Sequence, residues 1–410
     1  MKEWNTYKLK DICLKITDGS HFSPSACANG YPMFSVKDME EYGFNYSSCK
    51  RISTEDFNTL KANDCIPQKG DVLVAKDGSF LKQIFVCNET KEEAILSSIA
   101  IFRPNPEYVI PEFLCYILKS PKVYNYIAQN CVSGSALPRI VLKAFKEVEV
   151  SIPPVYVQEW IIGKLKPIDQ KIQLNRLIND NLEQQAQALY KSWFVDFEPF
   201  KDGEFIESEI GEIPAGWSIV KFGDIVEIPK KTINPQKFPD TIFNHYSLPA
   251  CDNGLIAEVQ AGKDIMSNKI ILQSNTTLFS KLNPRIKRIW FTCEVLPNSI
   301  CSTEFIQYRA KIDTEYSYIF SIVNSDAFYS SVMGCVNGAT GSHQRFHAED
   351  TEDFLCAYNK DAVNEFSKLI EPVLKQMHDL RQENVKLALT RDTLLPKLMS
   401  GELKINDLDC

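Results

Sequence analysis

Two long stretches of the chain place apolar residues at helical spacing, and the two stretches match each other along the sequence. Pro167 corresponds to Pro372, and the residues around them match at a constant offset of 205 residues. The apolar and small positions advance in alternating steps of four and three, which is the pattern of a heptad seam between packed helices. The sequence therefore predicts two repeated helices, over residues 157–193 and 362–398.

The seam residues are also the expected spacer between the two modules. They are Ile168, Ile172, Asn179, Leu182, Leu189 and Trp193 in the first stretch and Val373, Met377, Asn384, Leu387 and Leu394 in the second. A pseudo-twofold repeat would pair the helices antiparallel, as a spacer of about 55 Å. Asn179 and Asn384 lie near the middle of their helices, so a buried contact between them would fix the register. Solvated Asn residues at the edge of the seam are an equally good interpretation.

The segments outside these helices alternate short apolar runs with turn residues. Residues 71–75 and 99–102 have the length of strands and are bounded by Gly or Pro. We therefore expect an α+β fold, with two mixed α/β domains separated by two long helices that pack as an antiparallel coiled coil. The expected segments are residues 1–154 (first domain), 155–197 (central spacer helix), 198–360 (linker and second domain) and 361–410 (distal spacer helix and tail).

Composition and charge restrict the class of protein. The 410 residues suffice for two domains and connecting helices. No apolar run approaches the roughly 18 residues that span a membrane, and the N-terminus lacks a signal-peptide core, so we expect a cytoplasmic protein. The 13 Cys residues lack Cys-x-x-Cys spacing and are expected to be core residues. The net charge of -8 argues against indiscriminate nucleic-acid binding but leaves local basic surfaces open.

Motifs of common catalytic sites are missing from the sequence. It has no Gly-x-x-x-x-Gly-Lys-Ser/Thr, Gly-x-Gly-x-x-Gly, His-Glu-x-x-His or Gly-x-Ser-x-Gly, and no Asn-Pro-Pro-aromatic motif of amino-methyltransferases. His343 and His347 have i,i+4 spacing, but in a loop with Gly and Ser such spacing is more often accidental than a metal site. We therefore expect a chain that is not an enzyme and binds no metal.

Polar loops instead provide candidate contacts with DNA. Turns around Asp18 and Asp77 carry many donors and acceptors, small-residue loops precede Arg139 and Arg345, and residues 280–290 place four cations around a Pro turn. Satisfied turns and a solvated surface strand remain alternatives. The candidates are Thr17, Asp18, Gly19, Ser20, His21, Lys76, Asp77, Ser133, Gly134 and Arg139 in the first domain and Asn268, Lys269, Lys281, Arg285, Lys287, Arg288, Gly341, Ser342 and Arg345 in the second.

Six short motifs lie along the repeated frame, at residues 16–24, 73–79, 188–197, 267–269, 280–284 and 395–403. In this order they make the whole chain resemble the specificity subunits of Type I restriction–modification systems. The resemblance implies two target recognition domains that each read one half of a split DNA site, and an antiparallel helical spacer that sets the gap. It implies that methyltransferase subunits, two of them, and restriction subunits dock on this chain. S-adenosylmethionine, ATP and Mg are then expected on those partners and not on this chain.

Other interpretations remain open. A nuclease or single-chain methyltransferase would need a motif that is not found, a coiled-coil scaffold would bind only protein, and a silent or recombination-donor cassette would have the same sequence features. If the chain binds DNA, we predict that Lys281→Ala and Arg288→Ala weaken binding to all sequences and flatten its salt dependence. Changes near Asp18 or His21 should alter one half-site only.

Overall fold

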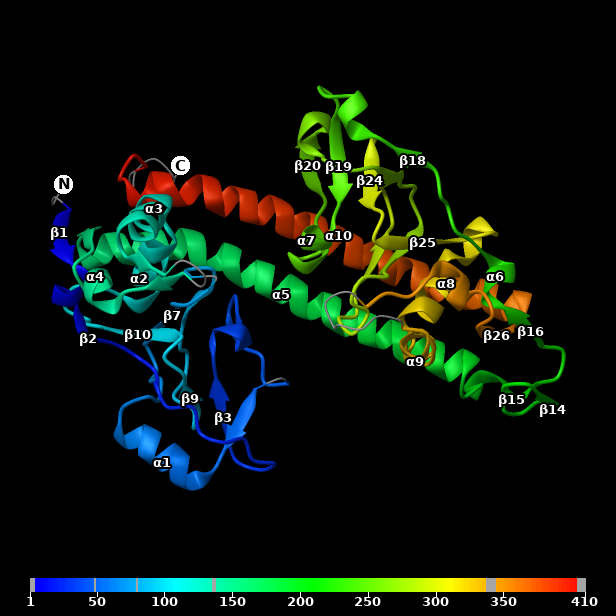
Figure 1. Ribbon diagram of the computed structural model, residues 1–410, viewed down its shortest axis with the longest axis horizontal. Coiled ribbons are helices and arrows are strands. Elements are labelled where there is room, and N and C mark those ends of the chain that lie inside the picture. The colour runs from blue at the N-terminus through cyan, green and yellow to red at the C-terminus, as the bar shows by residue number, and fades with distance from the viewer. Residues whose placement is uncertain (1–3, 48, 79, 135–137, 337–343, 404–410) are drawn as a thin grey trace. The chain divides into compact units, whose positions relative to one another are not determined.

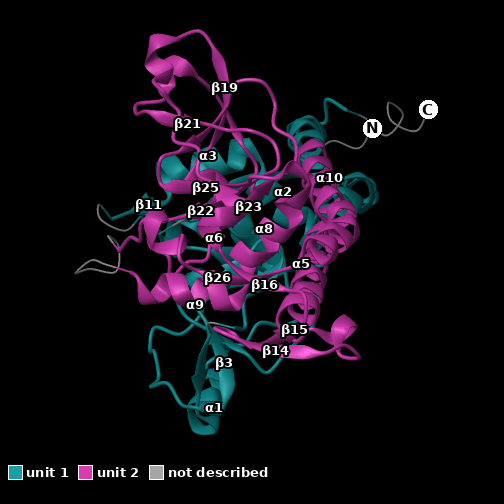
Figure 2. Cartoon of the chain, turned by 90° about the vertical axis from the view of Figure 1, so that its right-hand side faces the viewer, with its two compact units in different colours: residues 1–173, 387–410 teal, residues 174–386 magenta. Residues whose placement is uncertain are grey.

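The computed structural model describes residues 4–47, 49–78, 80–134, 138–336 and 344–403 (Figure 1). Contacts divide the chain into two compact units (Figure 2). Unit 1 comprises residues 1–173 and 387–410, and unit 2 comprises residues 174–386. Each unit therefore combines one mixed module with parts of both long helices, so the units cut across the four segments expected from the sequence.

The two long helices are α5, Val155–Phe194, and α10, Lys360–Met399. Figure 1 shows each as one uninterrupted ribbon. Pro167 and Pro372 both lie inside these helices on exposed positions. The side chain of Asn359 accepts hydrogen bonds from two backbone N–H groups in the first turn of α10, as an N-cap does. Gly401, with a φ of 73°, follows the other end, where a left-handed residue commonly terminates a helix.

Within each unit, α5 and α10 pack antiparallel. In unit 2 the side chain of Asn175 bonds Asn384, and the Tyr190 ring lies 6.2 Å from that of Phe366. In unit 1 Leu165 of α5 and Leu395 of α10 share one core cluster. The two unit 2 contacts define the direction of packing, because the later residue of α5, Tyr190, meets the earlier residue of α10, Phe366. The expected antiparallel packing is confirmed.

Both modules are built on a four-stranded antiparallel sheet with the same strand order. In unit 1 the order is β2-β10-β7-β8, with bounds Cys13–Asp18, Ile99–Pro104, Val72–Ala75 and Ile84–Val86. In unit 2 it is β17-β25-β22-β23, with bounds Val226–Glu227, Phe305–Ala310, Thr276–Ser280 and Ile289–Thr292. Helices α2 (Pro111–Lys119) and α3 (Pro121–Asn130) in unit 1 correspond to α8 (Tyr316–Asn324) and α9 (Asp326–Gly334) in unit 2. The internal repeat thus includes the module cores as well as the long helices.

The modules differ in a second, outer sheet. Unit 1 has three strands in the order β6-β3-β9 (Lys50–Ile52, Tyr31–Phe34, Ala94–Ile95), together with α1 (Thr54–Ala62). Unit 2 has five strands in the order β18-β21-β24-β19-β20 (Thr232–Ile233, Lys269–Ile271, Ser299–Ser302, Ile242–Tyr246, Glu258–Ala261), with α7 at Leu248–Asp252. One strand pair is parallel in each, β3 with β9 and β19 with β24. A shared core therefore carries two different outer parts.

Short strand pairs and helices complete each unit. The pairs are β1–β13 (Asn5–Lys8, Glu149–Ile152), β4–β5 (Met39–Glu40, Gly43–Phe44), β11–β12 (Val132–Ser133, Arg139–Ile140), β14–β15 (Phe205–Ser208, Gly211–Pro214) and β16–β26 (Ser218–Lys221, Leu355–Tyr358). The remaining α-helices are α4 (Leu142–Lys146) and α6 (Phe222–Ile225). Across the residues that the structure describes, no helix is both long and apolar enough to cross a membrane.

Candidate nucleic-acid interface

In unit 1, three predicted loops that are far apart in sequence meet at one edge of the four-stranded sheet. Asp18 ends β2 and Lys76 follows β7, and the Asp18 carboxylate lies 2.6 Å from the Lys76 ammonium. His21 approaches the same carboxylate, with 3.4 Å between Nε2 and Oδ1. The backbone N–H of Ile140 donates to the carbonyl of Lys76 at 2.9 Å, which brings in the third loop. The side chain of Lys76 is almost fully buried, so it neutralises Asp18 and is not placed to meet a phosphate.

The loop after Asp18 is held by close packing and hydrogen bonds. A Cβ on Gly19 would lie 2.3 Å from the carbonyl oxygen of Ile95, so the position admits only glycine without a shift. The Ser20 hydroxyl donates to the carbonyl of Phe22 at 2.7 Å and accepts from its N–H at 3.1 Å. His21 extends outward, with 74% of its side chain exposed. Thr17 lies within β2, opposite Ile101 of β10.

Arg139 lies at the same edge and is partly neutralised. Its guanidinium is 3.0 Å from the carboxylate of Asp77, and the two residues form an isolated β-bridge. The Arg139 side chain is 58% exposed, whereas that of Asp77 is 17% exposed. Ser133 and Gly134 lie nearby in the chain at the exposed end of β11. Of the unit 1 candidates, Arg139 and His21 are therefore the best exposed donors.

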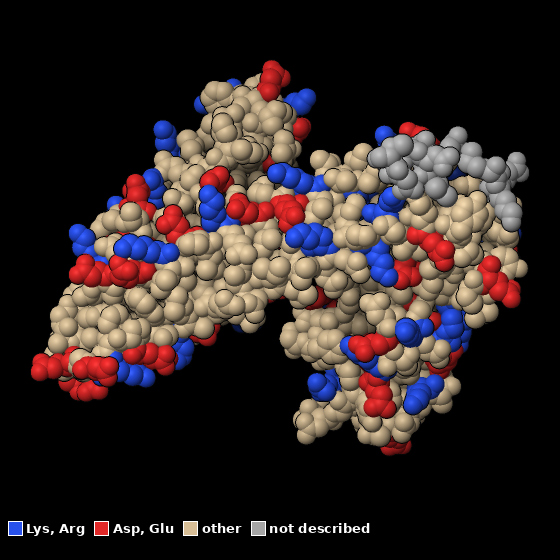
Figure 3. Space-filling model, turned by 180° about the vertical axis from the view of Figure 1, so that it is seen from behind, with Lys and Arg blue, Asp and Glu red and all other residues tan. Residues whose placement is uncertain are grey.

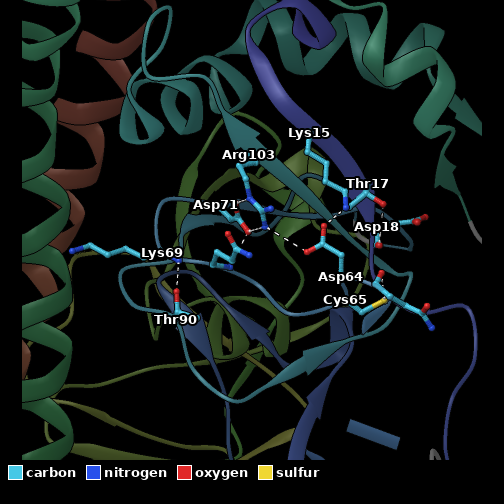
Figure 4. Close-up of polar contacts among 11 residues, drawn as sticks. Lys15, Thr17, Asp18, Asp64, Cys65, Lys69, Asp71, Thr90 and Arg103 are labelled. Carbon is cyan, nitrogen blue, oxygen red and sulfur yellow. Dashed lines mark hydrogen bonds and ion pairs between the residues drawn. The ribbon is translucent and has the colours of Figure 1, made fainter. Parts of the chain in front are cut away.

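Toward the opposite ends of these strands lies an ion-pair network that the sequence analysis missed. Figure 4 shows Arg103 of β10 reaching both Asp71 and Asp64, while Lys15 of β2 approaches the same Asp64. Arg103 makes a bidentate contact with the buried Asp71, at 2.8 and 2.9 Å, and this hydrogen bonding raises the pKa of Arg103. The sequence contained a signal for this network, because Asp71 and Arg103 each directly adjoin one of the two apolar runs. The network joins β2 and β10 to Asp71, the residue before β7, and so rigidifies the sheet.

Unit 2 repeats this arrangement with different side chains. Arg345 forms an isolated β-bridge with Leu282, and the N–H of Asn283 donates to the carbonyl of Gln344 at 2.8 Å. Arg345 makes a bidentate contact with Glu304, at 3.1 and 3.2 Å, and this hydrogen bonding raises the pKa of Arg345. Asn283 has a φ of 48°, and Gly78 at the corresponding place in unit 1 has a φ of 66°. The loops after β7 and β22 thus make the same left-handed turn.

The four cations of residues 280–290 do not form one available patch. Arg288 makes a bidentate contact with Asp252, at 2.6 and 2.9 Å, and only 14% of its side chain is exposed. Lys287 donates to the backbone carbonyl of Asn324 at 2.6 Å, and burial lowers the pKa of Lys287. Lys281 is half-buried, whereas Arg285 and Lys287 are exposed. Within the described part of the chain, Lys281 and Arg285 have no ion-pair partner and, unlike Lys287, no carbonyl bound to the charged group, so they are the cations most available to a ligand.

The remaining unit 2 candidates lie apart from this edge or outside the described residues. Lys269 is buried in the outer sheet, where it donates to the carbonyl and the hydroxyl of Ser267. Burial also lowers the pKa of Lys269. Asn268 is exposed beside it. Gly341 and Ser342 lie outside the described residues.

The long-helix seam has a different polar contact from the one expected. Asn384 accepts a hydrogen bond from Asn175 at 2.9 Å, so the expected contact between Asn179 and Asn384 is not formed. Antiparallel register then places Asn179 opposite Leu380, and its buried Oδ1 has no hydrogen-bond partner among the described residues. The other seam candidates are buried or half-buried: Ile168, Ile172, Leu182, Leu189, Trp193, Val373, Met377, Leu387 and Leu394.

Arg391 occupies a seam position because it has a carboxylate partner, which the sequence analysis also missed. Its guanidinium lies 2.9 Å from Asp169 of α5 and 3.4 Å from Glu41. The Tyr116 hydroxyl donates to the other oxygen of Asp169 at 2.7 Å. Burial opposes the charge of Arg391, but hydrogen bonding to Asp169 outweighs it and raises the pKa of Arg391. In unit 1 the helix pair is therefore joined to its module by a polar network.

Charges of both signs are interspersed on the face of the chain that Figure 3 shows, where Lys and Arg alternate with Asp and Glu. A surface of this kind attracts a polyanion only weakly. Together with the net charge of -8, it favours binding of DNA through a few placed cations and not through a broad basic surface.

Comparisons with known proteins agree with this picture. A family model described as "Type I restriction modification DNA specificity domain" matches residues 1–184. The MjaIX specificity subunit of a Type I restriction enzyme from Methanocaldococcus jannaschii is 23% identical over 99% of this chain and 95% of its own length. The HindI specificity subunit from Haemophilus influenzae is 24% identical over 98% of this chain and 100% of its own length.

A solved structure shares the fold. The specificity subunit of a Type I restriction–modification system from M. genitalium superposes with a TM-score of 0.53 at 14% identity, over 96% of each chain. The repeated modules and long helices described above are thus an architecture already seen in a specificity subunit. The resemblance inferred from the sequence, to the specificity subunits of Type I restriction–modification systems, is confirmed by these comparisons.

Proposed function

We propose that this chain reads a bipartite DNA site, with one half-site contacted by each module. The observation that carries the proposal is the repetition of one core with two different outer parts. The same four-stranded order presents an Arg-bearing β-bridge in both units, whereas the outer sheets have three and five strands. Since base readout depends on the side chains that a frame presents, one frame with two sets of side chains suits two different half-sites.

We further propose that catalysis belongs to partner subunits. Methyltransferase subunits, two of them, and restriction subunits would dock on this chain and would carry S-adenosylmethionine, ATP and Mg. The internal repeat supports two copies of one partner, because a repeated frame offers a similar surface twice. Exposed apolar side chains on the long helices support docking there: Leu174, Leu177, Leu369 and Leu389 are each about half exposed or more.

The test of DNA reading uses the full chain produced together with a Type I methyltransferase subunit from the same genome. Genomic DNA from cells with both genes is sequenced for methylated adenines. The expected result is one split motif with two different halves. A continuous motif would contradict the bipartite proposal. If no adenine were methylated although the chain still bound duplex DNA, the chain would recognise DNA without forming a functional complex with this methyltransferase.

The test of catalysis incubates the purified full chain with labelled methyl donor and duplex DNA, and separately with Mg²⁺ and duplex. We expect no methyl transfer and no cleavage until partner subunits are added. Transfer or cleavage by the chain alone would assign it an active site of its own.

A further inference from the structure

The two half-exposed arginines at the module edges share a position in the repeated fold. Arg139 and Arg345 lie 206 residues apart in sequence, and each pairs across an isolated β-bridge with the loop that follows the third strand of its sheet. Their side chains are 58% and 42% exposed. The loops that they face, at Gly78 and Asn283, both turn through a positive φ. The fold thus presents a guanidinium twice in the same local frame.

The carboxylates that hold these arginines are not repeated. In unit 1 the partner is Asp77, which is also the residue across the bridge from Arg139. In unit 2 the residue across the bridge is Leu282, and the carboxylate comes instead from Glu304, in the turn between β24 and β25. If the ion pair served the fold, both of its members would be expected to recur. What recurs is the arginine, which points to a ligand common to both modules.

The chemistry of that ligand follows from the present partners. A guanidinium bound side-on by two carboxylate oxygens, as in the Arg345–Glu304 pair, presents the fork that also binds two phosphate oxygens. The guanidinium is the exposed side of each pair, since Asp77 and Glu304 are only 17% and 27% exposed, so a phosphate can approach each arginine from solvent. Arg288 differs on each count, because its side chain is largely buried against Asp252 and the position 205 residues earlier is Gln83.

We propose that Arg139 and Arg345 each form a phosphodiester-binding site, one in each module, and that Asp77 and Glu304 occupy these sites until a DNA phosphate replaces them. The proposal rests on the proposed DNA reading and assigns it one backbone contact in each module. The carboxylates act as internal competitors. They weaken binding to any duplex by a similar factor, and a duplex that also satisfies the base contacts overcomes them.

The test measures binding of a labelled random-sequence duplex to the full chain over a range of KCl concentrations. Arg139→Ala and Arg345→Ala should each reduce the slope of log K against log salt by about 0.9, the value for one lost phosphate contact. Asp77→Asn and Glu304→Gln should tighten binding at low salt about threefold, because the competitor is removed. Arg139→Ala combined with Asp77→Asn should behave like Arg139→Ala alone.

Matched controls remove a carboxylate elsewhere. Glu147→Gln in unit 1 and Asp353→Asn in unit 2 each break an exposed ion pair with lysine and change the net charge equally. They should tighten binding much less than Asp77→Asn and Glu304→Gln. Arg139→Lys keeps the charge and should keep the slope, and thermal unfolding of every variant identifies any loss of fold.

The outcomes separate this proposal from the function on which it rests. If Asp77→Asn and Glu304→Gln weaken binding or match the controls, the carboxylates are not competitors and the proposal is wrong. Unchanged slopes in folded Arg139→Ala and Arg345→Ala would also overturn it, while the wild-type chain still binds DNA. A wild-type chain without any salt-dependent duplex binding would contradict the proposed DNA reading itself.

Discussion

Individual cations in this chain differ in availability although they look alike in sequence. Lys281, Arg285, Lys287 and Arg288 form one cluster in sequence, but the structure assigns Arg288 to Asp252 and Lys287 to a backbone carbonyl. The partner of Arg288 lies 36 residues away, and a contact of that kind depends on the fold. Residue identity therefore predicted where cations are concentrated, and only the structure shows which of them are free to bind a ligand.

This difference revises the expectation for the basic cluster. Lys281→Ala should reduce the slope of log K against log salt by about 0.9 with little change in stability. Arg288→Ala should instead leave the slope unchanged and lower the free energy of unfolding by about 1 kcal/mol, because Asp252 loses its partner. Salt-dependent duplex binding and denaturant unfolding of both variants check this, with Asp252→Asn as the matched control for stability. If Lys281→Ala and Arg288→Ala reduced the slope of log K against log salt equally, Arg288 would have to leave Asp252 to bind DNA.

His245 predicts a pH dependence of stability in unit 2. Its Nδ1 lies 2.8 Å from Gln260 Oε1, and its buried Nε2 has no partner among the residues described. Burial lowers the pKa of His245, so the folded state binds this proton less readily than the unfolded chain does. Stability should therefore fall as the pH drops below about 6.5, and the half-buried His378, whose pKa is also lowered by desolvation, acts in the same direction.

The measurement is denaturant unfolding at neutral and at mildly acidic pH. His245→Gln should reduce the loss of stability between the two conditions, since one of the two histidines with a lowered pKa no longer titrates. An identical acid-induced loss in wild type and His245→Gln would contradict this account.

At the scale of elements, the long helices were the most predictable part of the molecule. Their heptad pattern is local, because every seam position lies three or four residues from the next. The pairing of residues across the seam was less predictable, since the antiparallel register depends on how two helices that are distant in sequence align. Asn175 faces Asn384, and Arg391 is accommodated by Asp169, in both cases through contacts more than 200 residues apart.

The register of the seam predicts that the same Asn→Leu substitution has opposite effects on stability at two equivalent positions. Asn179 and Asn384 correspond at the offset of 205 residues, but only Asn384 bonds an amide across the seam. Asn179→Leu should raise the free energy of unfolding by about 1 kcal/mol, because it removes a buried unpaired oxygen and places Leu beside Leu380. Asn384→Leu should lower it by about 1 kcal/mol, because Asn175 loses one of its two hydrogen-bond acceptors. Denaturant unfolding checks both, and shifts of the same sign would show that the two positions face similar surroundings.

The sheets were less predictable than the helices for the same physical reason. β7 and β10 were recognisable as apolar runs, but their pairing, and the insertion of β10 between β2 and β7, join residues far apart in the chain. The repeat of the module cores also escaped the sequence comparison. Buried strands such as β10 and β25 need only apolar side chains, so corresponding positions keep hydrophobic character and lose identity.

At the scale of the whole molecule, the repeated core and the different outer sheets separate the part that is common from the part that can specify sequence. The four-stranded sheets and the Arg-bearing bridges occur twice, whereas the outer sheets differ in strand number. Of the predicted site, the unit 1 loops converge at one edge, while the unit 2 candidates divide between that edge, the outer sheet and internal ion pairs. The central claim is therefore that each module reads its own half-site.

The most direct test exchanges one module. Residues 198–360 of this chain are replaced by the corresponding segment of a related specificity subunit, and methylated adenines are mapped in cells that also express the methyltransferase. The account predicts that one half of the split motif changes to the donor's sequence and the other half stays as in the wild type. A change in both halves, or in neither, would contradict the claim that the two modules read separate half-sites.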